Sequence, residues 1–134
     1  VGQKALCSFQ RHRWVPVLPP TITHLYLDGN HISEINSTSL RDLPVLQYLD
    51  LAQQEVKLII RNNSFLRQRN LTQLVFSSNR GLTLEPRAFA GLSGLQVLLL
   101  DYIDLTDSIL SGNYLEPLVS LEELDLFGNK IEKL

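Results

Sequence analysis

The stretch LQVLLLDYIDL, residues 95–105, contains the pattern that decides the fold, and four other stretches repeat it. Leucine fills its first, fourth, sixth and eleventh positions. The related stretches are ITHLYLDGNHI (22–32), LQYLDLAQQEV (46–56), LTQLVFSSNRG (71–81) and LEELDLFGNKI (121–131). Their starts lie 24 to 26 residues apart. The chain is therefore a tandem array of short structural units.

Apolar residues alternate at the fourth and sixth positions of each unit, as Leu98 and Leu100 do. This alternation predicts a short strand with one buried face in every unit. The consensus L-x-x-L-x-L-x-x-N-x-L is identified as the leucine-rich repeat. We therefore expect an α/β fold class: a leucine-rich-repeat solenoid with a curved parallel sheet on the concave face, and loops and short helical turns on the convex face.

A second apolar register precedes the later units and predicts their convex packing. Leu40, Phe65, Phe89 and Leu115 lie six residues before a repeat start, and Leu43, Leu92 and Leu118 lie three before it, with Gln68 as the polar exception. We expect five repeats over residues 22–134, without a C-terminal cap. The pattern reaches Leu134 and stops there, which predicts an exposed apolar coil at that end.

The segment before the first repeat, CSFQRHRWVPVLPP (7–20), is expected to close the N-terminal end of the solenoid. From the residues alone, Cys7 is either a buried thiol or half of a disulfide. The cysteine and the V-P-x-L-P stretch resemble the N-terminal capping module of extracellular leucine-rich-repeat proteins, so residues 1–21 are interpreted as a partial cap. The resemblance implies a disulfide for Cys7 with a partner upstream of Val1, absent from this chain.

The ninth position of the repeat is filled by Asn30, Gln54, Asn79 and Asn129, but by Ile103 in the fourth repeat. An amide there can bond backbone groups of its own and the adjacent coil, so we expect a ladder of amides. Ile103 cannot form those bonds. We interpret it as a packing residue and expect its neighbours Tyr102 and Asp104 to point outward.

Composition excludes several classes of function. A net charge of −2 disfavours a nucleic-acid partner, and no apolar run is long enough for a membrane span. His12, His24 and His31 have no cysteine or acidic partners at metal-ligand spacing, so we expect no metal site. No Gly-x-Ser-x-Gly elbow presents a nucleophile. We therefore expect a binding protein with no cofactor and no enzymatic activity.

Three N-x-S/T sequons, at Asn36, Asn62 and Asn70, fall outside the strand cores. We predict that all three asparagines are glycosylated, which is typical of a secreted protein or an ectodomain. Glycans at Asn36 and Asn62 would keep the surface around them free of partners. This directs binding toward the concave face or the flank on which the chain leaves each strand, called the ascending flank below.

The repeat length, the convex phenylalanines and the cap resemble a Toll-like receptor ectodomain. More specifically, ALCSFQRHRWVPVLPP, IIRNNSF, LEPRAFAGLSGLQVL and LTDSILSGNYLEPLVSLEELDL resemble the N-terminal part of the flagellin-sensing members of that family, in particular their fish forms. The resemblance implies the extracellular part of a single-pass innate immune receptor. It also implies receptor homodimers in the parent protein and bacterial flagellin as the ligand, bound through its helical domain along a lateral flank.

The positions that match the ascending flank are the candidate ligand-binding residues: His31, Gln53, Glu55, Arg80, Tyr102, Asp104 and Lys130. Two other classes remain open. One is a structural extracellular leucine-rich-repeat protein such as a matrix proteoglycan core, and the other is an antigen-receptor or engineered binding scaffold on the same repeats.

Overall fold

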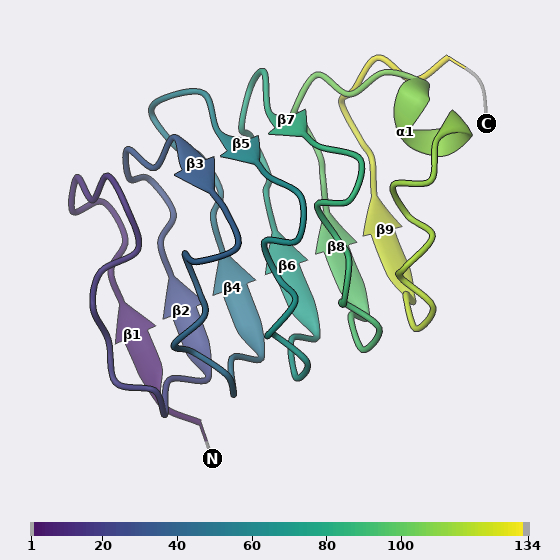
Figure 1. The fold of residues 1–134 in the computed structure, drawn as a ribbon. Helices are drawn as coiled ribbons and strands as arrows, with labels where there is room; N and C mark the ends of the chain where they lie inside the picture. Colours follow the sequence, from purple (N-terminus) through teal and green to yellow (C-terminus); the bar gives the residue numbers. More distant parts are fainter. Residues whose placement is uncertain (1, 133–134) are drawn as a thin grey trace.

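The computed structural model describes residues 2–132 as a stack of coils, each contributing one strand to a large sheet (Figure 1). The strands are β1 (Lys4–Leu6), β2 (His24–Tyr26), β4 (Tyr48–Asp50), β6 (Gln73–Val75), β8 (Val97–Leu99) and β9 (Glu123–Asp125). They lie side by side in that order, and each neighbouring pair is parallel. The predicted leucine-rich-repeat solenoid is confirmed.

The register of the large sheet follows the sequence repeat. Leu49 pairs with Leu25 on one side and with Leu74 on the other, and Leu98 continues the row to Leu124. The central leucine of each strand from β2 to β8 is fully buried, because side chains on that face point between the sheet and the convex segments. Equivalent positions of successive repeats therefore form rows along the molecule.

A second, smaller sheet lies on the far side of the coils and was not predicted. It consists of β3 (Glu34–Ile35), β5 (Ile59–Ile60) and β7 (Thr83–Leu84), all parallel. Only loops and helical turns were expected there, because a two-residue strand shows no alternation in a sequence. A single short helix, α1 (Ser108–Ser111), occurs in residues 2–132 and occupies the long interval after the fourth repeat.

The segment before the first repeat contributes a strand of its own. Ala5 of β1 pairs with Leu25, and Cys7 donates a backbone hydrogen bond to the Tyr26 carbonyl at 2.9 Å. Cys7 thus follows the cap strand as Leu27 follows β2. The cap covers the first repeat, whose Leu25 and Leu27 are completely buried.

The core contains a row of phenylalanines on its convex side. The Phe76 ring lies between Phe65 and Phe89, with centroids 6.5 and 6.4 Å apart. The polar exception in the convex register, Gln68, is 1% exposed and donates through Nε2 to the carbonyls of Leu40 and Leu43 at 2.7 and 3.3 Å. Gln68 therefore satisfies buried carbonyls that an apolar residue would leave to other donors.

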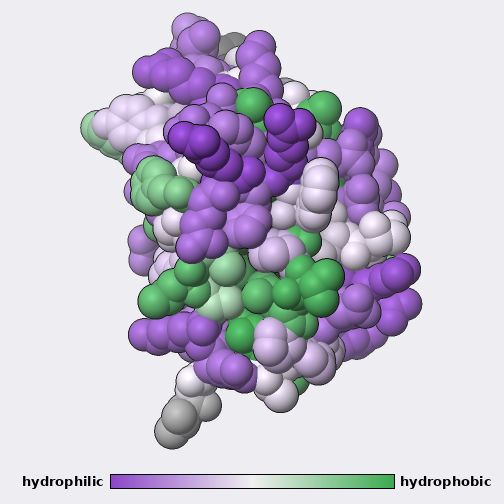
Figure 2. Space-filling model, turned by 90° about the vertical axis from the view of Figure 1, so that its left-hand side faces the viewer, coloured by the Kyte–Doolittle hydropathy of each residue, from purple (hydrophilic) through white to green (hydrophobic). Residues whose placement is uncertain are grey.

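Apolar side chains are exposed at the N-terminal end of the stack and partly exposed in the fifth repeat. At the N-terminal end, Figure 2 shows a green patch bordered by polar groups, and Leu6, Phe9, Trp14 and Val17 are the large exposed apolar residues of this segment. In the fifth repeat, Leu124 and Leu126 are half-buried, unlike their fully buried equivalents in earlier repeats. Leu134 lies outside the described residues.

Candidate functional site

The turn after each strand has the same backbone conformation throughout the stack. The residue before the ladder position has a positive φ in every repeat and in the cap: Phe9 55°, Gly29 71°, Gln53 56°, Ser78 61°, Tyr102 56° and Gly128 72°. This left-handed conformation costs a residue with a side chain about 1–2 kcal/mol. The conformation orients the residues that follow, and their side chains form the ascending flank.

The amide ladder predicted from the sequence is present in the turns. Asn79 donates to the carbonyls of Leu51 and Phe76 at 2.8 Å each and accepts from the Gln54 N–H at 2.9 Å. Gln54 and Asn129 bond in the same manner to neighbouring coils. Each amide therefore ties two coils together through backbone groups that would otherwise be buried without partners.

Ile103 interrupts this ladder without leaving its turn unbonded. Its side chain is fully buried, as the packing interpretation requires, and its N–H donates to Oδ1 of Asn129 at 3.0 Å. The adjacent Asp104 accepts from the Gly81 N–H at 3.0 Å through Oδ2. Asp104 was expected to point outward only, but it is half-buried and supplies the acceptor that Ile103 lacks.

Charged candidates on the ascending flank pair across coils. His31 Nε2 lies 3.2 Å from Glu55 Oε2, and Arg80 Nη1 lies 3.6 Å from Asp104 Oδ1. The Arg80 side chain is 80% exposed, so its guanidinium keeps most of its surface for a ligand. These contacts join the first repeat to the second and the third to the fourth, so residues just past neighbouring strands lie in a row along the ascending flank.

An aromatic pair extends this row toward the fifth repeat. Tyr102 and Phe127 meet edge to face with centroids 5.6 Å apart, and their exposed fractions are 42% and 69%. The Tyr102 ring also covers Gly128, where an added Cβ would lie 2.4 Å from a ring carbon. The pair is held in position and still presents apolar surface, which is typical of an anchor in a protein interface.

The two remaining flank candidates, Gln53 and Lys130, are exposed. The Lys130 N–H donates to the Leu105 carbonyl at 2.8 Å, which fixes its backbone but leaves the side chain in solvent. Phe127 was not among the predicted binding residues. Its position holds a small or acidic residue in the other repeats (Asp28, Ala52, Ser77 and Asp101), and this difference is the sequence signal that could have identified it.

The concave face offers a second, more polar surface. A shallow hollow of about 430 Å³ is lined by Lys4, His24, Tyr26, Gln47, Tyr48, Thr72 and Gln73. The Tyr48 ring lies 5.1 Å from Tyr26 and 6.0 Å from His24, between centroids. Burial, followed by the negative charge of Asp50, raises the pKa of Tyr48 to about 12, so its hydroxyl stays protonated at neutral pH.

The three sequons lie away from the ascending flank. Asn36 and Asn62 follow the small-sheet segments, and Asn70 lies just before the third repeat. Asn62 and Asn70 are exposed, whereas Asn36 is half-buried beside a groove. In the second and third sequons, the hydroxyl of the third residue donates a hydrogen bond to a backbone carbonyl of a neighbouring coil. Ser64 donates to the Ile35 carbonyl at 3.0 Å, and Thr72 donates to the Gln47 carbonyl at 3.1 Å.

Cys7 is a half-buried free thiol, and burial raises its pKa above the ordinary value. Among residues 2–132, no cluster of three or more His, Cys, Asp or Glu side chains could hold a metal ion. No helix in the described part of the chain is long and apolar enough to cross a membrane.

The chain is similar to known leucine-rich-repeat proteins. Models of the leucine-rich repeat match residues 21–43 and 118–133. The chain is 34% identical to Toll-like receptor 5 of Homo sapiens over 99% of its own length and 16% of that receptor. It is 32% identical to lumican of Mus musculus over 96% of its own length and 44% of that protein. The chain thus spans less than half of either relative.

A solved structure supports the fold. The mouse RP105/MD-1 complex contains a chain that matches with a TM-score of 0.88 at 24% identity, over 97% of this chain and 21% of that one. At this identity the likeness establishes the solenoid architecture alone.

Proposed function

We propose that this chain, which contains leucine-rich repeats and is similar to Toll-like receptor 5 along nearly its whole length, is part of the ectodomain of an innate immune receptor. Its role is to bind a protein ligand, not to catalyse a reaction. We further propose that the ligand is bacterial flagellin and that the parent protein is a single-pass membrane receptor that acts as a homodimer.

The observation that carries the binding proposal is the row on the ascending flank. The Tyr102 and Phe127 pair supplies an apolar centre, and Arg80 and Lys130 supply exposed positive charge on the same flank. An aromatic anchor surrounded by charged groups is the usual arrangement of a protein hot spot. Flagellin is a ligand of suitable shape, since the resemblance implies contact through its helical domain.

The dimensions of the row suit a helix. Strands in a sheet are about 4.8 Å apart, so the four steps from the first to the fifth repeat span about 19 Å. A helix covers that length in about 13 residues. Because the flank is held by ladder and ion-pair contacts, a helical ligand would meet a surface that is already ordered.

The test is titration of this chain with flagellin alongside a Phe127→Ala variant and an Arg80→Ala variant. Phe127 is 69% exposed, and removing its side chain leaves the buried core intact. We expect each variant to bind at least ten-fold more weakly, a loss of about 1.4 kcal/mol. Isothermal calorimetry measures the affinity.

The matched control is Gln96→Ala, an exposed position on the concave side of the same sheet. Equal binding by this variant and by the unmodified chain is expected. Unchanged affinity in both flank variants would rule out the ascending flank, and no binding by the unmodified chain would show that these repeats do not bind flagellin by themselves.

A structural role in the extracellular matrix is the second candidate, favoured by the similarity to lumican. An antigen-receptor or engineered scaffold would also use this fold. In the matrix role the ascending flank has no dedicated ligand. Loss of flagellin binding on flank substitution would therefore separate the receptor role from the matrix role.

A further inference from the structure

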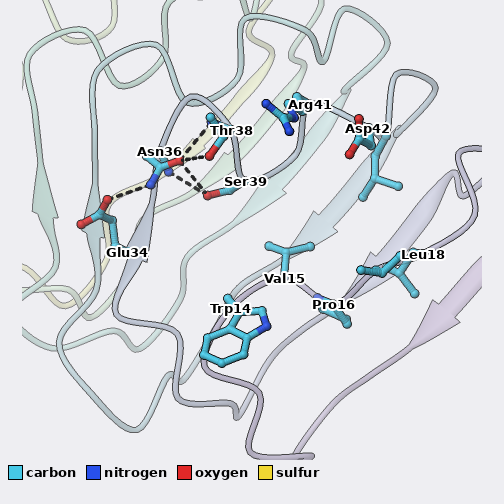
Figure 3. A pocket seen from close by; sticks show the side chains of 12 residues that line it. Trp14, Val15, Pro16, Leu18, Glu34, Asn36, Thr38, Ser39, Arg41 and Asp42 are labelled. Carbon is cyan, nitrogen blue, oxygen red and sulfur yellow. Dashed lines mark hydrogen bonds between the residues drawn. The ribbon is translucent and has the colours of Figure 1, made fainter.

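A groove of about 380 Å³ runs between the cap and the first convex segment. Figure 3 shows Trp14, Val15, Pro16 and Leu18 on one side and Glu34, Asn36 and Thr38 on the other. The apolar side is open to solvent, since Trp14 is 72% exposed. Val17, which lines the same groove, is fully exposed as well, and neighbouring apolar side chains left open to solvent are typical of an interaction surface.

Asn36, the residue of the first sequon to which a glycan would be attached, lines this groove. Asn36 Oδ1 accepts from the N–H and the hydroxyl of Thr38 at 3.0 and 2.8 Å. Its Nδ2 donates to Glu34 Oε2 at 2.8 Å, its one hydrogen bond within residues 2–132. These bonds fix the plane of the amide, and a second N–H remains on Nδ2 for substitution.

We propose that Asn36 carries an N-linked glycan whose first sugars lie in this groove against the indole of Trp14. The reaction needs a lipid-linked oligosaccharide diphosphate from the secretory pathway. Asn36 Nδ2 forms a bond to the anomeric carbon, the bond from that carbon to the diphosphate oxygen breaks, and the amide loses one proton to a base. The lipid diphosphate is the leaving group.

The groove fits a sugar in both its polar and its apolar halves. One face of a pyranose ring carries C–H groups, which are attracted to the negative face of an indole. The hydroxyl and acetamido groups would face the polar side, where Glu34 and Ser39 offer acceptors. Glycosylated Asn36 keeps one N–H, which is enough to preserve its bond to Glu34.

The other two sequons provide a contrast. Neither Asn62 nor Asn70 lines this groove. Sugars on those residues would extend into solvent, so only the Asn36 glycan is expected to change the surroundings of Trp14. This inference rests on the extracellular location in the proposed function, but not on flagellin as the ligand.

Trp14 is the only tryptophan of the chain, so its fluorescence reports on the groove directly. We would secrete two variants from a eukaryotic host, Thr38→Ser, which keeps the sequon, and Thr38→Ala, which removes it. We expect the acrylamide quenching constant of Trp14 to be roughly two-fold lower in Thr38→Ser, because a sugar covers one face of the indole. Peptide mass analysis establishes occupancy of Asn36.

Two controls isolate the glycan. Asn62→Gln should leave the quenching constant unchanged, and both Thr38 variants should be quenched equally when made in a host that adds no N-glycans. The proposal is overturned if Asn36 is unmodified in the secreted Thr38→Ser variant, or if it is modified and Trp14 is quenched equally in the two secreted variants. Flagellin titration of the same samples tests the receptor role separately.

Discussion

The carboxylate of Asp104 accepts a hydrogen bond from the backbone N–H of Gly81, with Oδ2 3.0 Å from the nitrogen. In the first and fourth repeats, the equivalent N–H bonds a ladder amide: Ile32 donates to Gln54, and Leu105 donates to Asn129, both at 3.0 Å. The acceptor has therefore moved by one residue in the fourth repeat, from the ladder position to the residue after it.

This relationship predicts that Asp104→Ala destabilises the fold by about 1–3 kcal/mol, because the N–H of Gly81 loses its acceptor. Loss of the Arg80 ion pair adds little, since the Arg80 side chain is 80% exposed. Urea unfolding measures the change. Asp104→Asn keeps an acceptor oxygen and tolerates the φ of 64° at this position, so it should retain most of the stability.

A double-mutant cycle tests the exchange of roles between neighbouring residues. Ile103→Asn places an amide at the ladder position, where its oxygen can accept from Gly81. Asp104→Ala should then cost less in the Ile103→Asn background than in the unmodified chain, with a coupling of about 1 kcal/mol. Strictly additive free energies of unfolding would show that Asp104 does not replace the ladder amide.

The repeated left-handed turn predicts a stabilising glycine. Ser78 has a φ of 61° and an exposed side chain, and Gly29 and Gly128 occupy the same turn position at 71° and 72°. Ser78→Gly should raise the free energy of unfolding by about 0.5 kcal/mol, because relief of backbone strain exceeds the entropy cost of glycine. Thermal unfolding measures the effect, and a lower midpoint would contradict it.

The reverse change at Gly128 serves as the matched comparison. Gly128→Ser would force a left-handed serine and push its Cβ against the Tyr102 ring. We expect it to destabilise the fold and to disturb the aromatic pair on the ascending flank together. A variant with normal stability would show that the Tyr102 ring moves aside freely.

Acid should weaken the contribution of Glu34 to the stability of the folded protein. The hydrogen bonds from Asn36 and Arg61 lower the pKa of Glu34 below its ordinary 4.5. A lowered folded-state pKa means that this stabilisation is present above pH 4.5 and is lost as pH falls through the folded pKa. Compared with Glu34→Gln, the unmodified chain should lose more stability on acidification. Parallel denaturant curves from pH 7 downward check this.

The charged form of Asp50, in contrast to that of Glu34, should lower the stability of the folded protein at neutral pH. Burial is the main reason that its pKa is raised above 3.8, so its charged form is unfavourable in the folded state. Asp50→Asn should therefore increase stability at neutral pH, and the gain should shrink as pH falls through the raised pKa toward 3.8. The Ala52 N–H keeps an acceptor in this variant. A loss of stability at pH 7 would contradict the prediction.

The thiol of Cys7 should react slowly in the folded protein. Partial burial raises its pKa, so the fraction present as reactive thiolate is smaller than in the unfolded chain. Alkylation at pH 8 should be slower without urea than with it. Equal rates would show that the cap strand β1 opens readily.

Much of the fold could be predicted from the sequence, because each coil repeats the same local rule. The strands that contain Leu25, Leu49, Leu74, Leu98 and Leu124 were expected where they occur. The small sheet was not, since its two-residue strands are too short to show an apolar period. The cap strand was not, since Ala5 occupies the position where the repeats have leucine. Two pairs of the predicted flank residues are in contact, His31 with Glu55 and Arg80 with Asp104. Phe127 was left out of the prediction, although its large side chain occupies a position that is small or acidic in the other repeats.

The sequence by itself determined the solenoid, its register and its core, because a repeat of apolar positions defines which side chains each coil must bury against the next. Tertiary structure alone decided which groups meet across coils: Asp104 with Gly81, Tyr102 with Phe127, and Trp14 with Asn36 in one groove. Those pairs are about one repeat apart in the chain and share no periodic signature. Their contacts depend on how the turns of neighbouring coils stack, which no local pattern encodes.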